Sequence, residues 1–190
     1  MKGNCFTYKL IVALLCFSVT HLCSMAAEGA TVNTHAHGLS EMYFAIENQR
    51  LVIELISPAI DLVGFEHKAK TKKSINKVKK VEKRLSEHNE MFSLSGGNCQ
   101  LNSSFIDVSS LINIPDDHQH HQEHSHKKNT HSEVIANYDY HCENVSELSS
   151  ITVKVFQLSI SVKEVQAVWI TEMYQGTERL NANNNVINLR

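Results

Sequence analysis

Hydrophobic and polar residues alternate over several stretches of the chain, which is the pattern of strands with one buried face. Residues 41–47 and residues 51–56 alternate in this way, and Asn48-Gln49 lies between them. We therefore expect a β-hairpin whose second strand ends at Ser57-Pro58. The side chains predicted to face the core are Met42, Phe44 and Ile46 on the first strand, and Leu51, Ile53 and Leu55 on the second.

Helical periodicity is clearest over residues 71–92, where apolar side chains recur every three or four positions and lysines fill the opposite face. This pattern predicts an amphipathic helix that covers one face of a sheet. The preceding residues 59–67 are expected to be a short irregular or helical piece, and Gly96-Gly97 ends the connection that follows the helix. The apolar positions of the helix are Ile75, Val78, Val81 and Leu85.

Residues 99–108 and 134–142 alternate again. Antiparallel pairing of these two strands would bring Cys99 near Cys142 and make the intervening segment the tip of a long hairpin. The alternation predicts one face with Leu101, Ser103 and Phe105, and an opposite face with Asn102, Ser104 and Ile106.

Three more strands are expected towards the C-terminus. They cover residues 151–158, 165–173 and 176–180. The sum is an α+β fold: an antiparallel β-sheet of about six strands, one main helix and a His-rich disordered loop.

The first residues have the features of an export signal. Lys2 and Lys9 accompany a short apolar run, residues 10–19, and residues 24–27 offer a small-residue cleavage site. The run is too short to span a bilayer, which needs about 20 residues. Cys23 suggests a lipoprotein as the alternative, but the residues before it are a poor context for lipid attachment.

Cleavage would remove residues 1–27 and leave residues 28–190 as a single domain, long enough for its own core. No later stretch is apolar enough to cross a membrane. We therefore expect a soluble, exported protein, with no membrane insertion of the mature chain.

Net charge indicates which partners the chain can bind, and cysteine content indicates whether it forms a disulfide. The net charge is −2, so there is no basic face of the kind that nucleic acid requires, and the basic residues 68–83 are expected to form a solvated helix face. Cys99 and Cys142 are the cysteines left after signal removal. In an oxidising compartment they predict a disulfide; the alternative is a pair of thiolate metal ligands.

Residues 116–131 are rich in histidine and contain no large apolar side chain. Such a tract cannot bury enough surface to order itself, so we expect a disordered loop. Neutral imidazole is the commonest metal ligand of proteins, and the composition therefore favours metal binding over a solvated linker or a pH-responsive loop. The candidate ligands are His118, His120, His121, His124, His126 and His131.

A second group of candidate ligands lies outside this tract. His35 and His37 would point to the same side of an extended segment, so that both could reach one ion, and Gly38 allows a turn after them. Glu66 and His67 could complete a three- or four-ligand site. The alternative is an ordinary turn with a surface histidine.

Two further patterns could indicate reactive or catalytic side chains. Asp139 and His141 share one face of their strand, either as a carboxylate–imidazole pair or as part of a polar outer face. Residues 120–124 match H-x-x-E-H, an inverted zinc-protease pattern, but that reaction needs a rigid helix in a cleft. A phosphate-binding glycine loop and a nucleophile elbow are also missing from the sequence.

Several of these motifs occur together in one order. They are His35-Ala36-His37-Gly38, Ser57-Pro58-Ala59, Gly64-Phe65-Glu66-His67, the histidine tract and Tyr140-His141-Cys142. In this combination the chain resembles the ZrgA-like periplasmic zinc-uptake proteins of Gram-negative bacteria, from about residue 32 to the last strands. The resemblance implies binding of Zn²⁺ in the periplasm, a role in zinc acquisition, and delivery of zinc to an ABC transporter or its periplasmic binding protein. It also implies that the protein has no enzymatic activity.

The expected mechanism has two tiers. An ordered site would use His35, His37, His67 and Glu66, with His141 as a further candidate, and the histidine tract would collect several ions more weakly. One alternative function is buffering of copper or nickel against toxicity, since copper binds most nitrogen ligands more tightly than zinc does. A second alternative is an exported zinc hydrolase.

Overall fold

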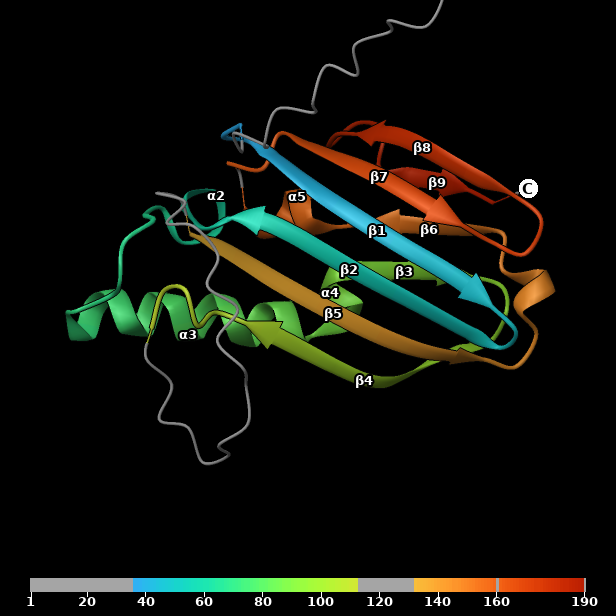
Figure 1. The fold of residues 1–190 in the computed structure, drawn as a ribbon, viewed down its shortest axis with the longest axis horizontal. Coiled ribbons are helices and arrows are strands. Elements are labelled where there is room, and N and C mark those ends of the chain that lie inside the picture. The colour runs from blue at the N-terminus through green and yellow to red at the C-terminus, as the bar shows by residue number, and fades with distance from the viewer. Residues whose placement is uncertain (1–35, 113–131, 160, 190) are drawn as a thin grey trace, which may run out of the picture. The chain divides into compact units, whose positions relative to one another are not determined.

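The computed structural model describes residues 36–112, 132–159 and 161–189, which form two β-sheets and several helices (Figure 1). The longest helix is α3, Lys72–Ser86. The shorter helical segments are α2 (Ala59–Val63), α4 (His88–Met91), the 3-10 turn η1 (Val145–Glu147) and α5 (Val155–Leu158). The strands are β1 (Leu39–Glu47), β2 (Arg50–Pro58), β3 (Phe92–Ser95), β4 (Cys99–Asp107), β5 (Glu133–Cys142), β6 (Ser150–Val153), β7 (Glu164–Ile170), β8 (Gln175–Leu180) and β9 (Val186–Asn188).

The predicted hairpin is present at the centre of the larger sheet. This sheet has six strands in the order β4-β5-β2-β1-β7-β8, and β1 pairs with β2 antiparallel across the turn at Asn48. Asn48 has φ of +54°, a left-handed conformation that asparagine tolerates better than most residues. The inward positions predicted for both strands are buried.

The prediction of a purely antiparallel sheet is wrong at one pair of strands. β7 runs parallel to β1, with Phe44 opposite Trp169, so the sheet is mixed. Parallel neighbours require a long crossover, and here the chain passes through the second sheet between β1 and β7. Alternation of side chains is the same in either direction, so it could not reveal this pairing.

A second, three-stranded sheet was not predicted. Its order is β3-β6-β9, all antiparallel. The predicted strand at residues 151–158 is divided between β6 and α5. These strands have three or four residues each, which is too short for alternation to identify them.

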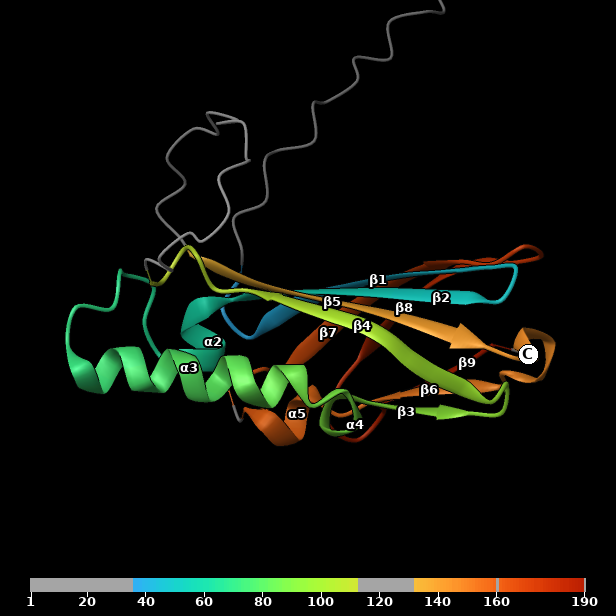
Figure 2. The same cartoon turned by 90° about the horizontal axis from the view of Figure 1, so that it is seen from below.

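The hydrophobic core lies on one face of the six-stranded sheet. Figure 2 shows α3 and the three-stranded sheet on the same side of that sheet. Val78 and Leu85 of α3 are completely buried in this core, and the Tyr138 hydroxyl of β5 donates to the Leu85 carbonyl at 2.6 Å. The predicted role of the helix as a cover for the sheet is confirmed.

The helix is shorter than the pattern predicted. A capping box between Thr71 and Ser74 satisfies donors at its start. It ends at Ser86, because Glu87 adopts a non-helical conformation (φ −79°, ψ 79°), and α4 follows as a separate turn.

The disulfide between Cys99 and Cys142 is confirmed. The two cysteines are opposite each other where β4 and β5 pair antiparallel. A β-bulge between Leu101 and Ser103 shifts the register of β4. The predicted common face for Leu101 and Phe105 is therefore wrong: Leu101 packs against the core, whereas Phe105 is 65% exposed.

The expected signal segment and the expected disordered loop lie outside the residues that the structure describes. Within those residues, no helix is both long enough and apolar enough to cross a membrane.

Candidate functional site

The candidate site begins at a turn that leads into β1. His37 is exposed on this turn, and Gly38 follows it with φ of +87°, a conformation that favours glycine. The Gly38 carbonyl accepts the backbone N–H groups of Lys163 and Glu164 at 2.8 and 2.9 Å. The start of β7 therefore fixes the backbone that carries His37.

A buried carboxylate accepts a hydrogen bond from the backbone of the same turn. Asp61, on α2, is only 5% exposed, and its Oδ2 accepts the Gly38 N–H at 2.7 Å. Burial raises the pKa of Asp61 because it disfavours the charged carboxylate, although the Gly38 N–H and the charges of His37 and Lys163 act in the opposite direction. Sequence reasoning missed Asp61; the available signal was an acidic residue in the first turn of a helix that follows a proline.

Glu66 places a second carboxylate, with a buried Oε1, beside His37. Its Oε1 lies 3.6 Å from Nε2 of His37, with the Glu66 side chain 18% exposed and that of His37 57% exposed. The Glu66 backbone carbonyl accepts a hydrogen bond of 2.7 Å from the Ser132 hydroxyl. An imidazole nitrogen and a carboxylate oxygen are thus close enough to bind one ion. The structure thus brings these two candidate ligands close together.

The other predicted ligands of this ordered site are His67, which the structure describes, and His35, which it does not. The His67 ring is exposed and lies against Phe65, with ring centroids 5.0 Å apart. His35 lies just outside the described residues. Among the residues that the structure does describe, no group of three or more His, Cys, Asp or Glu side chains could hold a metal ion. A complete tetrahedral site therefore needs donors beyond His37 and Glu66.

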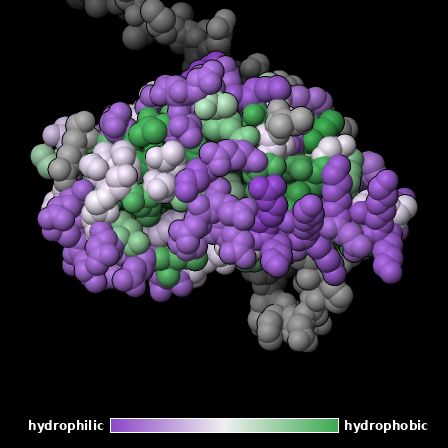
Figure 3. Space-filling view, turned by 180° about the vertical axis from the view of Figure 1, so that it is seen from behind, coloured by the Kyte–Doolittle hydropathy of each residue, from purple (hydrophilic) through white to green (hydrophobic). Residues whose placement is uncertain are grey.

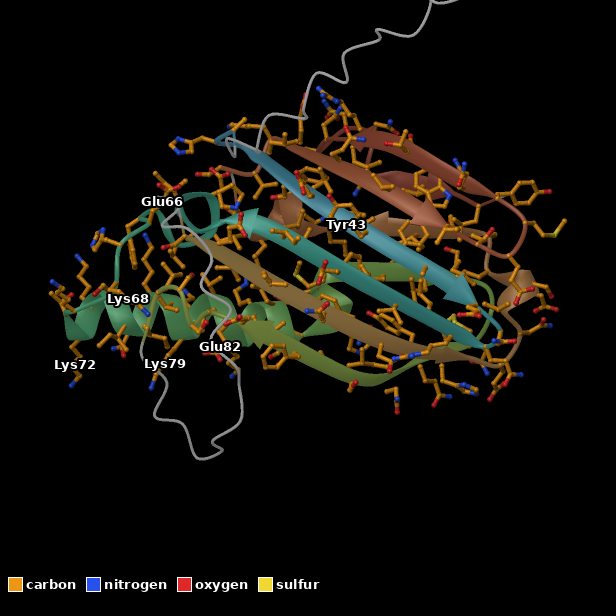
Figure 4. The ribbon with its side chains drawn as sticks, viewed as in Figure 1. Tyr43, Glu66, Lys68, Lys72, Lys79 and Glu82 are labelled. Atoms are coloured by element: carbon orange, nitrogen blue, oxygen red, sulfur yellow. A yellow bond between two sulfur atoms is a disulfide. The ribbon has the colours of Figure 1, made fainter. Side chains whose placement is uncertain are left out.

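The histidine tract also lies outside the described residues, but both of its flanks are placed. Before it, the Leu111 carbonyl accepts the Ala69 N–H at 2.7 Å. After it, Ser132 bonds to Glu66 and its carbonyl accepts the Ala59 N–H at 2.8 Å. Figure 4 shows Glu66 on the connection between α2 and α3. The described residues on either side of the tract are therefore bonded to Glu66 and to the neighbouring Ala69 and Ala59.

His141 lies at the far end of the sheet. It is exposed on β5 opposite Arg50, whereas Glu133 of the same strand is opposite Pro58. Eight residue steps along a strand correspond to about 27 Å, so the structure does not bring His141 to His37. Asp139 forms two hydrogen bonds with Arg50, at 2.9 and 3.0 Å, which confirms the polar outer face rather than a carboxylate–imidazole pair.

An open hollow on the outer face of the six-stranded sheet is a competing candidate. Its walls are mainly apolar, with Tyr43, Val52 and Ile170 among the lining residues and Glu54 as a carboxylate. The Tyr43 hydroxyl donates to Glu41 at 2.8 Å. The residues that line this hollow include no histidine or cysteine, so its chemistry does not suit a transition metal.

Comparison with known proteins points to one family. The model of the family described as "ZrgA family zinc uptake protein" matches residues 34–189. This match begins immediately before the His37 turn and includes every described element. A search of the curated proteins finds no match to the chain.

Proposed function

The chain belongs to the ZrgA family of zinc uptake proteins, and we propose that it is a periplasmic protein that binds zinc as cargo and delivers it for uptake. The recipient would be a zinc ABC transporter or its periplasmic binding protein. We propose no catalytic activity. The family description supports zinc as the ion, and the features of an export signal support the compartment.

The observation that carries the proposal is the 3.6 Å separation between His37 Nε2 and Glu66 Oε1. Zinc accepts histidine nitrogen and carboxylate oxygen together in a tetrahedral site, so this donor pair fits the ion. Two further donors are needed. We propose that His35, two residues before His37, is one, and that a histidine of the tract or His67 is the other.

The anchored backbone of the site supports this assignment. Gly38, held by Asp61 and by the start of β7, fixes the turn that carries His37. Ser132 in turn fixes the backbone of Glu66. Preorganised ligands lose less conformational entropy on binding, so this pair would bind zinc more tightly than histidines on a disordered segment.

We propose that the histidine tract serves as a second, weaker tier. Its two flanks are hydrogen-bonded beside Glu66 and Ala69, so an ion held anywhere on the tract stays within reach of the ordered site. Tethering of this kind raises the effective concentration of the ion near the site without any new contact. Binding on the tract would therefore speed loading of the ordered site.

Titration calorimetry with zinc tests this arrangement on protein purified without a histidine tag. Replacing His35 and His37 with alanine should remove the tightest site and keep the weak sites, and Glu66→Gln should weaken the tightest site. Deletion of residues 118–126 should remove weak sites and keep the tight one. If that deletion abolished every site, the two-tier proposal would be wrong.

His141→Ala is the matched control, since this histidine is exposed but lies at the far end of the sheet. It should leave the tightest zinc site unchanged. Cellular function is tested separately with a deletion strain. Poor growth under zinc starvation supports uptake, whereas sensitivity to excess copper or nickel would contradict it in favour of metal buffering.

A further inference from the structure

The solvent side of α3 carries six exposed lysines and forms a continuous basic surface. At 100° per residue these lysines cover about 160° of the helix circumference. The same arc contains Asn76 and Arg84 but no carboxylate, because Glu82 projects towards the buried side. Figure 3 shows hydrophilic side chains gathered over the side of the molecule where α3 lies. We call this surface the lysine face: Lys72, Lys73, Lys77, Lys79, Lys80 and Lys83.

Repulsion between the charges of the lysine face destabilises α3. Lys73 and Lys77 are four residues apart, as are Lys79 and Lys83, and like charges at this spacing repel. The first turn contains lysines and no acidic residue, which is unfavourable at the positive end of the helix dipole. Within the described residues, none of the six ammonium groups forms a salt bridge. An anionic partner would relieve this repulsion.

The residue types on the lysine face favour a surface of phosphate groups over an acidic protein as the partner. The whole chain has a net charge of −2 although α3 is strongly basic, so the positive charge is concentrated on this one side. Protein–protein interfaces are enriched in aromatic residues and depleted in lysine, and the arc has no aromatic or apolar side chain. Lysine is a mobile point charge, which suits phosphates spread over a surface.

We propose that the lysine face docks the protein reversibly on a bilayer of anionic phospholipids, by charge alone and without insertion. Each lysine held near such a surface contributes about fivefold to the partition coefficient. Figure 4 shows Lys72 and Lys79 extending from α3 on the side away from Glu66. This docking is independent of the proposed zinc function.

Co-sedimentation of the purified chain with vesicles tests the proposal. Vesicles of phosphatidylcholine with roughly one-third phosphatidylglycerol should bind the protein, pure phosphatidylcholine vesicles should not, and high salt should release it. Replacing Lys79, Lys80 and Lys83 together with glutamine should lower the partition coefficient by about a hundredfold. Urea unfolding should show this variant to be at least as stable as the unmodified chain, because repulsion on the helix is removed.

The matched control removes the same charge elsewhere, with Arg50, Lys154 and Arg179 replaced by glutamine. It should lower binding far less than the α3 variant does. Equal losses in the two variants would show that net charge alone attracts the protein, and the proposal would fail. Binding to polyglutamate but not to anionic vesicles would also overturn it, in favour of an acidic protein partner.

Discussion

The six-stranded sheet holds its charged and polar side chains in different ways at its two ends. At one end, Cys99 is bonded to Cys142 and Asp139 is paired with Arg50. At the other end, the Asp61 carboxylate is buried under a glycine N–H, and the His37 imidazole is exposed beside Glu66. The first end satisfies its groups with partners on neighbouring strands. The second end leaves an exposed imidazole nitrogen 3.6 Å from a carboxylate oxygen that is itself buried.

The comparison shows how one strand pair can serve stability and binding separately. β5 begins beside Glu66, through Ser132, and ends at Cys142. A covalent bond at its far end fixes the β4–β5 pair irrespective of what occupies the segment between them. The histidine tract can then be long and polar without loosening the sheet.

Removal of the disulfide should change the free energy of unfolding more than any other variant proposed for testing this separation. Replacing Cys99 and Cys142 with alanine should lower the free energy of unfolding by roughly 4 kcal/mol, the chain-entropy value for a loop of this size. The affinity for zinc should not change under conditions where the variant is folded, because the His37 turn is held by other contacts. Urea denaturation and zinc calorimetry measure the two quantities. Loss of the tight zinc site in the folded variant would contradict the separation of the two ends.

Much of the fold that surrounds these ends could be predicted from the sequence. The hairpin of β1 and β2, the helix α3 and the pairing of Cys99 with Cys142 each depend on patterns within one or two continuous segments. The parallel pairing of β1 and β7 depends on how distant segments meet, which alternation does not encode. The bulge in β4 changed the face of Phe105 because one extra residue reverses all later side chains.

The candidate site was predictable only in part, for a similar reason. His37 and Glu66 were identified because their residue types are metal ligands and the motifs around them were specific in combination. Asp61 was missed because its role is to hold a backbone N–H, and a carboxylate in a short helix does not reveal that contact in the sequence. His141 was included as a histidine within one of the motifs of the resemblance, and strand register places it at the opposite end of the sheet from His37.

Two glycines provide the next test, because each is required at a different end of the sheet. At Gly176, opposite Trp169, an added Cβ would lie 2.3 Å from the ring. Gly176→Ala should lower the free energy of unfolding by about 1–3 kcal/mol through overpacking. Its zinc affinity should stay unchanged, since this clash is far from His37.

Gly38→Ala should have a smaller effect on stability and a larger one on zinc. The left-handed backbone at Gly38 would cost roughly 1–2 kcal/mol with alanine, and the added Cβ would meet the flexible Lys163 side chain. Relief of that strain by rotation of the turn would displace His37, so zinc should bind more weakly. Equal zinc affinities for the two variants would show that the turn does not position the ligand.

The smallest effect concerns two carboxylates, Asp61 and Asp139, whose pKa values are shifted in opposite directions. Burial raises the pKa of Asp61, whereas the hydrogen bond from Arg50 lowers the pKa of Asp139. The unfolded value of both is about 4. The contribution of Asp61 to stability is therefore full below that value and is lost as pH rises through its folded pKa. The contribution of Asp139 is full above that value and is lost as pH falls through its folded pKa.

Asparagine at either position removes the titration and keeps a hydrogen-bonding oxygen. Measured without zinc, in the presence of a chelator, Asp61→Asn should become more stable relative to the unmodified chain as pH rises above about 4. Asp139→Asn should become less stable relative to the unmodified chain as pH rises from the acid end of the series towards about 4, because Asp139 ionises beside Arg50 in the folded state before it ionises in the unfolded state. Urea denaturation across this pH series gives both slopes. Slopes of the same sign would mean that one end of the sheet does not hold its carboxylate as the structure describes, and the contrast between the two ends would lose its electrostatic basis.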